Sequence, residues 1–435
     1  MSEPLNRYVT LPRWELPTDV LVAVLAVAWQ QSRGGAAAEI QFKVEQQAAI
    51  DVSLKDSVRV RLRMSTMPTE RGATITFRLQ RLGAQRLVRT LEEAGYLPEQ
   101  VEIFERAVVG KGGLTTLAGT VGSGKSVTLA ILMALIHRMR PAIKGVSFED
   151  PVEIESEWMH QRTIARDLHA DDDREFRAAT AALFRSAVDV FMLGEVRDAD
   201  AGRVVRAVLE SGHSVYTTTH ARSALGVFSK YCMPQIGIPI ETLATPGMLR
   251  LNVYQSLLLR NCPHCSLPPE AHADNLDGQG RGRLATTLGH IEELFGVARQ
   301  GLRFRNPMGC DHCRRLGLQE LNGYAGRTVV AEMVEPDETM CQLILKNDMV
   351  GLLRYWRGLS DGDIGSTNLV GKTAMEVGML KASQGLIDPR EIERDFDAFD
   401  TLAQRQRIEK QLAARMHAAR NSVFGTKLGL TGGPA

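Results

Sequence analysis

The sequence predicts an α/β fold with a parallel sheet, followed by a cysteine-bearing segment and a helical C-terminal part. Three observations favour this organisation. From about residue 96 to residue 260, strand-like apolar runs alternate with helical patterns, as parallel α/β sheets require. A glycine-rich loop at 119–126 separates one such strand from a helix. Two C-x-x-C pairs lie beyond residue 260, where the alternation ends.

Composition narrows the class of protein. The chain has 435 residues, of which 44% are hydrophobic, so a length prior suggests roughly two to four domains. Charged residues make up 24%, the net charge is +1 and aromatic residues are only 6%. A strongly basic or aromatic nucleic-acid surface is therefore not indicated. The apolar run at 20–29 is shorter than the roughly 20 residues of a bilayer span, and we expect a buried helix in a cytoplasmic protein.

The first 95 residues predict a small α+β domain and a short helix. A helix begins at Thr18 or Asp19 and ends near Ser32. Alternating apolar residues then predict strands at 39–45, 50–56, 57–64 and 75–79, in a domain that ends near residue 83. A helical pattern at 87–95 closes on Gly95.

The C-terminal half gives weaker signals. A glycine-rich polar stretch at 277–283 predicts a loop, and the chain after Val334 is expected to be helical. Residues 401–424 form a basic helical candidate, either a solvated helix or one that docks to anionic lipid or a partner. The last seven residues are expected to be flexible. The predicted domain limits are 1–85, 86–261, 262–332, 333–398 and 399–435.

The glycine-rich loop GTVGSGKS has the spacing and context of a Walker A motif, because it lies between an apolar strand and a helix. Backbone N–H groups and the helix N-terminus there favour phosphate. We expect Lys125 to reach the β- and γ-phosphates of ATP and Ser126 to bind Mg²⁺. The predicted nucleotide-binding residues are Gly119, Thr120, Val121, Gly122, Ser123, Gly124, Lys125, Ser126 and Val127.

Three further strands end in residues suited to phosphoryl transfer. Glu149 and Glu153 follow one strand and can orient or deprotonate the attacking water, although an acidic turn in solvent fits the same pattern. Glu195 follows the next strand and is the expected Mg²⁺ group. His220 ends another strand, opposite His213, and is the candidate γ-phosphate sensor.

The six cysteines indicate metal rather than disulfide chemistry. The two C-x-x-C pairs are Cys262 with Cys265 and Cys310 with Cys313, and together they predict one structural Zn²⁺ in a closed tetrahedron. Four free thiols are the alternative. His264 and His312 lie inside the two turns and should point away from the metal, while the remaining cysteines, Cys232 and Cys341, should be buried apolar residues.

The four motifs, in this order, resemble those of the type II/IV secretion ATPase superfamily. GTVGSGKS matches its Walker A, FEDPVE at 148–153 its Asp box, MLGEVRD at 192–198 its atypical Walker B and SGHSVYTTTHARSA at 211–224 its His box. The stretch at 63–79 is similar to a family segment whose arginines approach the nucleotide, which implies that role for Arg63 and Arg78. A rival interpretation is a solvated basic face, because Arg59 and Arg61 alternate with Arg63.

The resemblance implies the architecture and partners of the GspE/PilB branch, which carries a tetracysteine segment. It implies a RecA-like P-loop ATPase core, a PAS-like N-terminal domain, a zinc-binding insertion and C-terminal helices. It further implies a homo-hexamer that acts on an inner-membrane platform protein, with only peripheral membrane association, in secretion, pilus assembly or conjugative transfer. A pilus retraction ATPase, a nucleic-acid translocating motor and a catalytically silent ring subunit are the alternatives.

The sequence also departs from the family pattern. Glu39 and Arg63 are only 24 positions apart, which indicates a shortened N-terminal domain. Ala187-Val188 replaces an Asp-Pro pair, and the stretch from Gln255 to Leu259 lacks both arginines of the Q-R-L-x-R segment.

Overall fold

The structure, a computed structural model, describes residues 17–30, 40–53, 59–70, 72–82, 90–164, 174–315 and 318–427. These residues form two compact units. The smaller comprises 17–82 together with the short segment 153–157, and the larger comprises 90–152 and 158–427. This division into two units does not test the five domain limits predicted from the sequence, which stay predictions.

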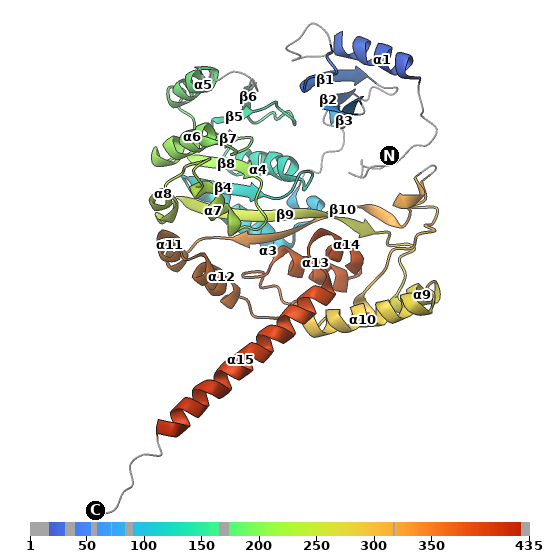
Figure 1. The fold of residues 1–435 in the computed structure, drawn as a ribbon. Helices are drawn as coiled ribbons and strands as arrows, with labels where there is room; N and C mark the ends of the chain where they lie inside the picture. Colours follow the sequence, from blue (N-terminus) through green and yellow to red (C-terminus); the bar gives the residue numbers. More distant parts are fainter. Residues whose placement is uncertain are drawn as a thin grey trace, which may run out of the picture. The chain divides into compact units, whose positions relative to one another are not determined.

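The larger unit is built on a seven-stranded sheet (Figure 1). The strand order is β10-β9-β4-β8-β7-β5-β6, and every neighbouring pair is parallel except β10 with β9. The predicted α/β class with a mainly parallel sheet is thereby confirmed. The strands are β4 (Gly113–Ala118), β5 (Gly145–Glu149), β6 (His160–Thr163), β7 (Val190–Leu193), β8 (Ser214–Thr219), β9 (Leu249–Asn261) and β10 (Tyr324–Val334).

Helices cover both faces of this sheet, which is why the central strands β4, β7 and β8 are buried along their whole length. One face packs on α2 (Leu91–Ala94), α3 (Pro98–Val109) and α4 (Lys125–Met139). The other packs on α5 (Arg174–Phe184), α6 (Ala199–Glu210), α7 (Gly226–Cys232), α8 (Ile240–Ala244), α11 (Glu338–Leu345) and α12 (Met349–Gly358). The helix predicted to close on Gly95 does so, with φ of 103° at that glycine.

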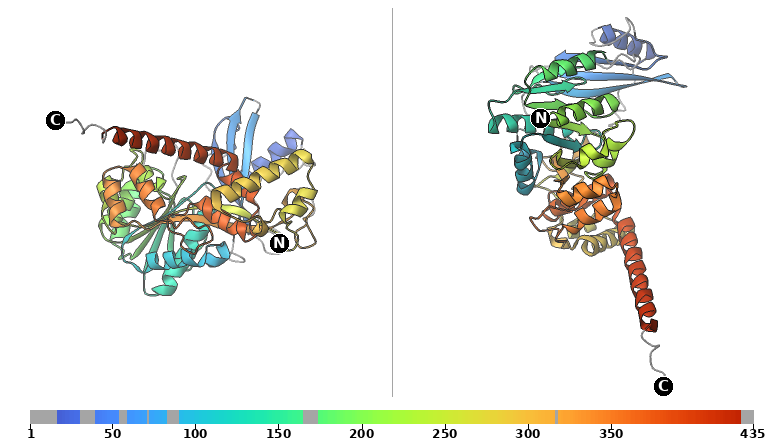
Figure 2. Two further views of the ribbon diagram at one scale, coloured as in Figure 1. Left: turned by 90° about the horizontal axis from the view of Figure 1, so that it is seen from below. Right: turned by 90° about the vertical axis from the view of Figure 1, so that its left-hand side faces the viewer.

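A third core packs against Leu258 of β9 and Val330 of β10. It gathers α10 (Gly278–Phe295), α13 (Ala374–Ser383), α14 (Pro389–Asp395) and the first residue of α15 (Phe399–Lys427), with α9 (Pro269–Asp274) and the short 3₁₀ turns η2 (Arg299–Gly301) and η3 (Gln319–Leu321) nearby. The basic helix predicted at 401–424 lies within α15, which extends beyond the rest of this unit (Figure 2). The flexible end predicted at 429–435 lies outside the described residues.

The loop predicted at 277–283 is wrong, because these residues open α10. Asp277 caps the helix by accepting the N–H of Gly280 at 2.6 Å. Leu284, Leu288 and Ile291 follow at helical spacing and are buried. This apolar stripe outweighs the low helix propensity of the glycines in the first turn.

The smaller unit is an antiparallel sheet of β1 (Gln46–Ser53), β2 (Arg59–Thr69) and β3 (Gly72–Leu82) with α1 (Thr18–Gln30). The strand predicted at 75–79 lies within β3. Those predicted at 50–56 and 57–64 are matched by β1 and β2 as far as the structure describes them, because residues 54–58 lie outside the described residues. The strand predicted at 39–45 is wrong. Residues 42–44 form a turn or bend, and Gln41 N–H donates to the side chain of Gln46 at 2.6 Å.

The expectation of a buried α1 is also wrong. Only Leu25 and Trp29, one turn apart, are buried, and they pack with Ala48 and Met64. Val24 and Val27 are more than half exposed, at 54% and 56%. A three-stranded sheet offers one small apolar face, which covers a single stripe of the helix.

Candidate functional site

The phosphate loop joins β4 to α4, and its backbone depends on glycine. Gly122 and Gly124 have φ of 81° and 88°, in the left-handed region that favours glycine. A Cβ on Gly119 would lie 2.4 Å from the carbonyl oxygen of Gln255. The Nζ of Lys125 is buried in the loop, where it donates to the carbonyls of Gly119 at 2.8 Å and Thr120 at 2.9 Å. The loop is therefore curved back around its own lysine.

Three other strands end at the same edge of the sheet as this loop, because β4, β8, β7 and β5 are parallel neighbours. His220 follows β8, and its Nδ1 lies 3.0 Å from the carbonyl oxygen of Gly119. A carbonyl can only accept, so Nδ1 carries the proton. The other ring nitrogen, Nε2, lies 3.4 Å from Oε1 of Glu195, which follows β7. His220 thus joins the phosphate loop to Glu195, whereas His213 lies at the opposite end of β8.

The acidic segment after β5 divides between the two units. Glu149 accepts from the hydroxyl of Ser147 at 2.7 Å and from the amide of Gln161 at 2.9 Å, in the larger unit. Asp150 forms an ion pair with Arg197, which follows Glu195, at 2.9 Å. This pair links the segment after β5 to the segment after β7.

Glu153 belongs to the smaller unit, where it pairs with Arg63 at 2.8 Å. Arg63 lies directly opposite Arg78 in the register of β2 and β3. Arg78 is exposed, and Arg61 on the same face of β2 pairs with Asp51 at 2.7 Å. Arg63 and Arg78, which lie on consecutive antiparallel strands, are therefore side by side on one face of this sheet.

The two C-x-x-C pairs lie together in the larger unit. All four sulfur atoms are within 4.8 Å of one another. Sγ of Cys262 is 3.8 Å from that of Cys310, and Sγ of Cys265 is 3.6 Å from that of Cys313. A zinc tetrahedron with Zn–S bonds of about 2.3 Å has S–S edges of about 3.8 Å, so the thiols fit the metal. Burial opposes ionisation of Cys313, but N–H groups of Cys310 and Gly323, both 3.2 Å away, lower its pKa to about 7.

The other histidines and cysteines stay outside this cluster. The rings of His264 and His312 stack on each other, with centroids 3.9 Å apart, and neither belongs to the group of four thiols. Cys341 is buried as expected. Cys232, at the end of α7, is only partly buried, which corrects the prediction.

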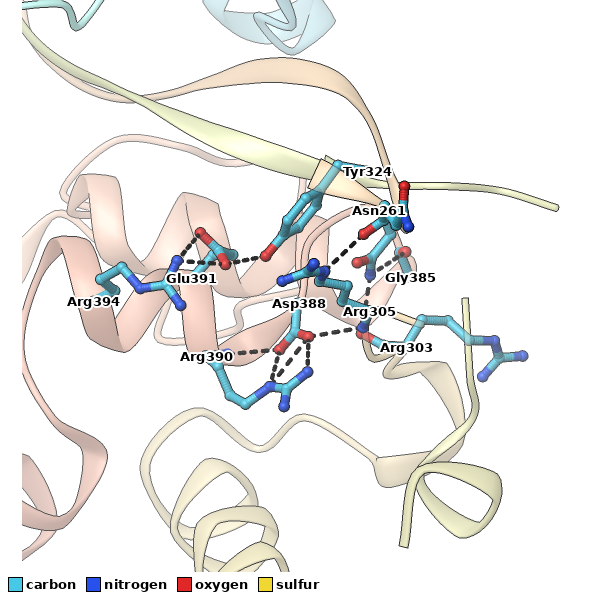
Figure 3. A network of polar contacts seen from close by, with 10 residues as sticks. Asn261, Arg303, Arg305, Tyr324, Gly385, Asp388, Arg390, Glu391 and Arg394 are labelled. Carbon is cyan, nitrogen blue, oxygen red and sulfur yellow. Dashed lines mark hydrogen bonds and ion pairs between the residues drawn. The ribbon is translucent and has the colours of Figure 1, made fainter. Parts of the chain in front are cut away.

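A polar network fastens the tetracysteine segment to α14 (Figure 3). Asp388 is buried at the start of α14 and accepts the backbone N–H of Arg305 at 2.8 Å. Glu391 accepts the hydroxyl of Tyr324, the first residue of β10. Asn261, the last residue of β9, donates to backbone carbonyls on both sides of the junction. These carbonyls belong to Arg303 and Gly385. Arg390 pairs with Asp388, and Arg394 with Glu391.

Gln255 of β9, which belongs to the divergent Q-R-L-x-R segment, has a role at the site that the sequence does not predict. Its Nε2 donates to the carbonyl of Ser123 in the phosphate loop at 2.7 Å. The one signal in the sequence was a polar amide next to the apolar run at 257–259, and β9 carries other polar residues, so that signal did not single out Gln255. Lys230 of α7, which donates to the carbonyl of His220, left no comparable signal.

The fold and this site define a RecA-like α/β protein with a phosphate loop at the carboxyl edge of its sheet. The chain matches the family model described as type II/IV secretion system protein over residues 37–376, and it belongs to that family.

Named relatives agree with this assignment. The chain is 26% identical to the type IV pilus assembly ATPase PilB of Pseudomonas aeruginosa over 80% of this chain and 54% of that protein. It is 29% identical to the type II secretion system protein E of Klebsiella pneumoniae over 66% of this chain and 51% of that protein. The chain thus spans about half the length of these curated relatives.

A solved structure supports the fold. The X-ray structure of the Legionella pneumophila ATPase DotB matches with a TM-score of 0.51 and 17% identity, over 81% of this chain and 77% of that chain. No helix among the described residues is both long and apolar enough to cross a membrane.

Proposed function

We propose that this chain is a cytoplasmic ATPase motor subunit that powers type II secretion, type IV pilus assembly or a related conjugative transfer system. The observation that carries the proposal is the contact of His220 with both the phosphate loop and Glu195. Because the ring of His220 contacts both groups, a movement of the Gly119 carbonyl or a change in the charge of Glu195 would alter its contacts. The relatives' names, family membership and this arrangement all support nucleotide-driven work.

The residues of the loop fit ATP with Mg²⁺. The loop leads into the N-terminus of a 15-residue helix, which favours anionic phosphate. The Ser123 hydroxyl is buried without a hydrogen-bond partner among the described residues, which leaves a donor for a phosphate oxygen. Lys125 would meet the β- and γ-phosphates, while Ser126 and Glu195 would hold the metal. Mg²⁺, when bound, neutralises charge on the phosphoryl group.

The chain's own residues would then position water and charge. Glu153 is the proposed base, with Glu149 in reserve, because one carboxylate must orient the attacking water. His220 would sense the γ-phosphate through its contact with Glu195. Arg63 and Arg78 would stabilise the developing phosphoryl charge, since a guanidinium fork never deprotonates. The ion pair of Arg63 with Glu153 joins two of these candidates within the smaller unit.

We further propose a homo-hexamer that acts on an inner-membrane platform protein and meets the membrane only peripherally. The four cysteines would hold one structural Zn²⁺ as thiolates. Retention of the phosphate loop together with Glu195 argues against a silent ring subunit. The near-neutral net charge of +1 argues against a nucleic-acid motor.

The decisive experiment measures phosphate release and ATP binding in parallel. Wild type should hydrolyse ATP, and Glu153→Gln should bind ATP but turn over roughly 10² to 10⁴-fold more slowly. Glu195→Gln should show the same separation of binding from turnover. Hydrolysis at the wild-type rate in Glu195→Gln would remove its assignment to the metal. Stimulation by single-stranded DNA, rather than by a platform-protein fragment, would favour the nucleic-acid motor.

Mixed subunits test the arginines. Arg78→Ala should reduce turnover far more than ATP binding, because the contact strengthens in the transition state; arginine fingers contribute roughly 10³ to 10⁵ in rate elsewhere. Arg78→Ala and Lys125→Ala subunits, each poor alone, should partly restore hydrolysis when mixed. If co-assembled mixtures show no rescue, Arg78 does not act across an interface.

A further inference from the structure

A phosphate loop directs its N–H groups toward the ligand, so several of its carbonyls face the protein and need donors there. Ser123 illustrates this requirement, since the residue is only 3% exposed. The Nε2 of Gln255 donates to its carbonyl at 2.7 Å, from β9, the neighbour of β4 in the sheet (Figure 1). Gln255 is fully buried, so its side chain makes this bond away from the protein surface.

A tyrosine fixes the orientation of that glutamine. The hydroxyl of Tyr96 donates to Oε1 of Gln255 at 2.6 Å, which leaves Nε2 facing Ser123. The same hydroxyl lies 3.2 Å from Oγ1 of Thr128 in α4. Because the Tyr96 proton is used on Gln255, Thr128 is the donor in this second bond. Burial also raises the pKa of Tyr96, so the phenol keeps the proton that it donates.

The resulting chain of donors has one direction: Thr128 to Tyr96, Tyr96 to Gln255, and Gln255 to Ser123. Its two ends, Ser123 and Thr128, lie on either side of the pair that the proposed function assigns to ATP and Mg²⁺, Lys125 and Ser126. Each of the four residues in this chain of donors is at most 3% exposed. The chain therefore bridges the junction of the loop and α4 from behind.

Packing holds this bridge closely against the junction. A Cβ on Gly124 would lie 3.3 Å from Nε2 of Gln255, tighter than ordinary contact. The ring of Tyr96 packs edge-on against Phe104 of α3, with centroids 5.1 Å apart. The bridge therefore lies directly against Gly124 of the junction on one side and Phe104 on the other.

We propose that Thr128, Tyr96 and Gln255 form a clasp that sets the conformation of the phosphate loop in which Lys125 and Ser126 meet the nucleotide. They are positioning residues, since they act through the loop. The inference rests on the proposed function, because it assumes that the loop binds nucleotide. Without the clasp, the carbonyl of Ser123 loses its donor, and the loop must leave its binding conformation or carry an unsatisfied buried group.

The test measures ADP affinity of the full-length chain, together with its thermal unfolding. Tyr96→Phe keeps the ring and removes one hydroxyl, and it should weaken ADP binding by about 5 to 10-fold, the scale of one hydrogen bond. Gln255→Glu places an acceptor against the Ser123 carbonyl and should weaken binding further, by roughly 10 to 100-fold. Thr128→Val should weaken ADP binding, whereas Thr128→Ser, which keeps the hydroxyl, should restore it.

Tyr324→Phe is the matched control, because Tyr324 is an equally buried tyrosine whose hydroxyl donates to Glu391 instead. It should change stability without changing ADP affinity. If Tyr96→Phe and Thr128→Val lower stability as Tyr324→Phe does, yet bind ADP like wild type, the clasp has no positioning role. Failure of wild type to bind ADP would refute the proposed function, whereas ADP binding without hydrolysis leaves the clasp fully testable.

Discussion

The phosphate loop and the tetracysteine cluster both belong to the larger unit, yet they are built in opposite ways. The loop is one contiguous segment whose polar groups come mainly from the backbone, and Thr120, Val121 and Ser126 on it are exposed. The cluster joins two pairs of cysteines 48 positions apart, with Cys262 and Cys313 buried.

The difference in exposure and in sequence separation reflects what each kind of site requires. A site that exchanges ligands needs an open side, so its precision must come from supports behind it, such as Gln255. A structural metal site is closed and has no ligand to exchange, so the chain can use it to join distant segments. Substitutions in the first region should therefore change turnover with little effect on folding. Substitutions in the second should do the reverse.

The largest effect is expected for Lys125→Ala. This removes the charge that the phosphates meet, and turnover should fall by roughly 10³, the scale of losing one well-placed electrostatic donor. ATP binding should weaken as well. Phosphate release and binding of a fluorescent ATP analogue measure both effects. Lys346→Ala, at the exposed end of α11, is the control and should match wild type. If the Lys125→Ala protein also lost its bound zinc, the two regions would not be independent, because a change in the phosphate loop would then disturb the folding of the tetracysteine cluster.

Cys262→Ser should produce the converse result. Structural zinc sites are worth roughly 10 to 16 kcal/mol of apparent binding free energy, so loss of one thiolate should release the metal and loosen the segment between β9 and β10. Metal analysis should show one zinc per wild-type chain and none in the variant. Limited proteolysis should cut within 262–323, while ATP binding stays within about twofold of wild type.

Cys341→Ser controls for the loss of any buried thiol, because Cys341 lies in α11, outside the cluster. It should retain its zinc. Wild-type protein purified without chelators and found free of zinc would instead support four free thiols. Loss of ATP binding in Cys262→Ser would show that the two regions are energetically joined.

The motifs of both regions could be predicted because their signals are local. The glycine spacing of the phosphate loop and the apolar strands before Glu149, Glu195 and His220 are contiguous patterns, and parallel strands bring their ends to one edge. The clasp could not be predicted, since Tyr96 and Gln255 are 159 positions apart and meet only across the folded sheet.

The errors have a related cause. Glycines at 278–282 indicated a loop, yet the buried stripe of Leu284, Leu288 and Ile291 makes a helix. Alternation at 39–45 indicated a strand, yet Ile40 and Phe42 reach the small core from residues outside any strand. In both places tertiary packing, which a local pattern does not contain, decided the structure.

The smallest effect concerns Lys381 of α13, which connects the surroundings of the two regions. Its Nζ contacts the carbonyl of Gly95, next to Tyr96, and both Oγ1 of Thr328 at 3.1 Å and the carbonyl of Val329 in β10, the strand that follows the tetracysteine segment. Burial lowers its pKa from 10.5 to about 7. A neutral amine keeps two N–H groups, one for each of the two carbonyls that it contacts.

The pH dependence follows from that shift. Between pH 7 and 10.5 the lysine is protonated in the unfolded chain but largely neutral in the folded one, so folding releases a proton and stability rises with pH. The slope contributed by one proton is about 1.4 kcal/mol per pH unit. In Lys381→Met the free energy of unfolding, measured with urea at pH 7, 8 and 9, should therefore rise less steeply than in wild type by up to that amount. Lys346→Met, at an exposed position, should keep the wild-type slope.

Equal slopes in wild type and Lys381→Met would mean that the ammonium stays charged in the core. The contacts of Lys381 with Gly95 and β10 would then be charge-assisted, and the phosphate-loop and tetracysteine regions would be joined more tightly than the comparison above requires.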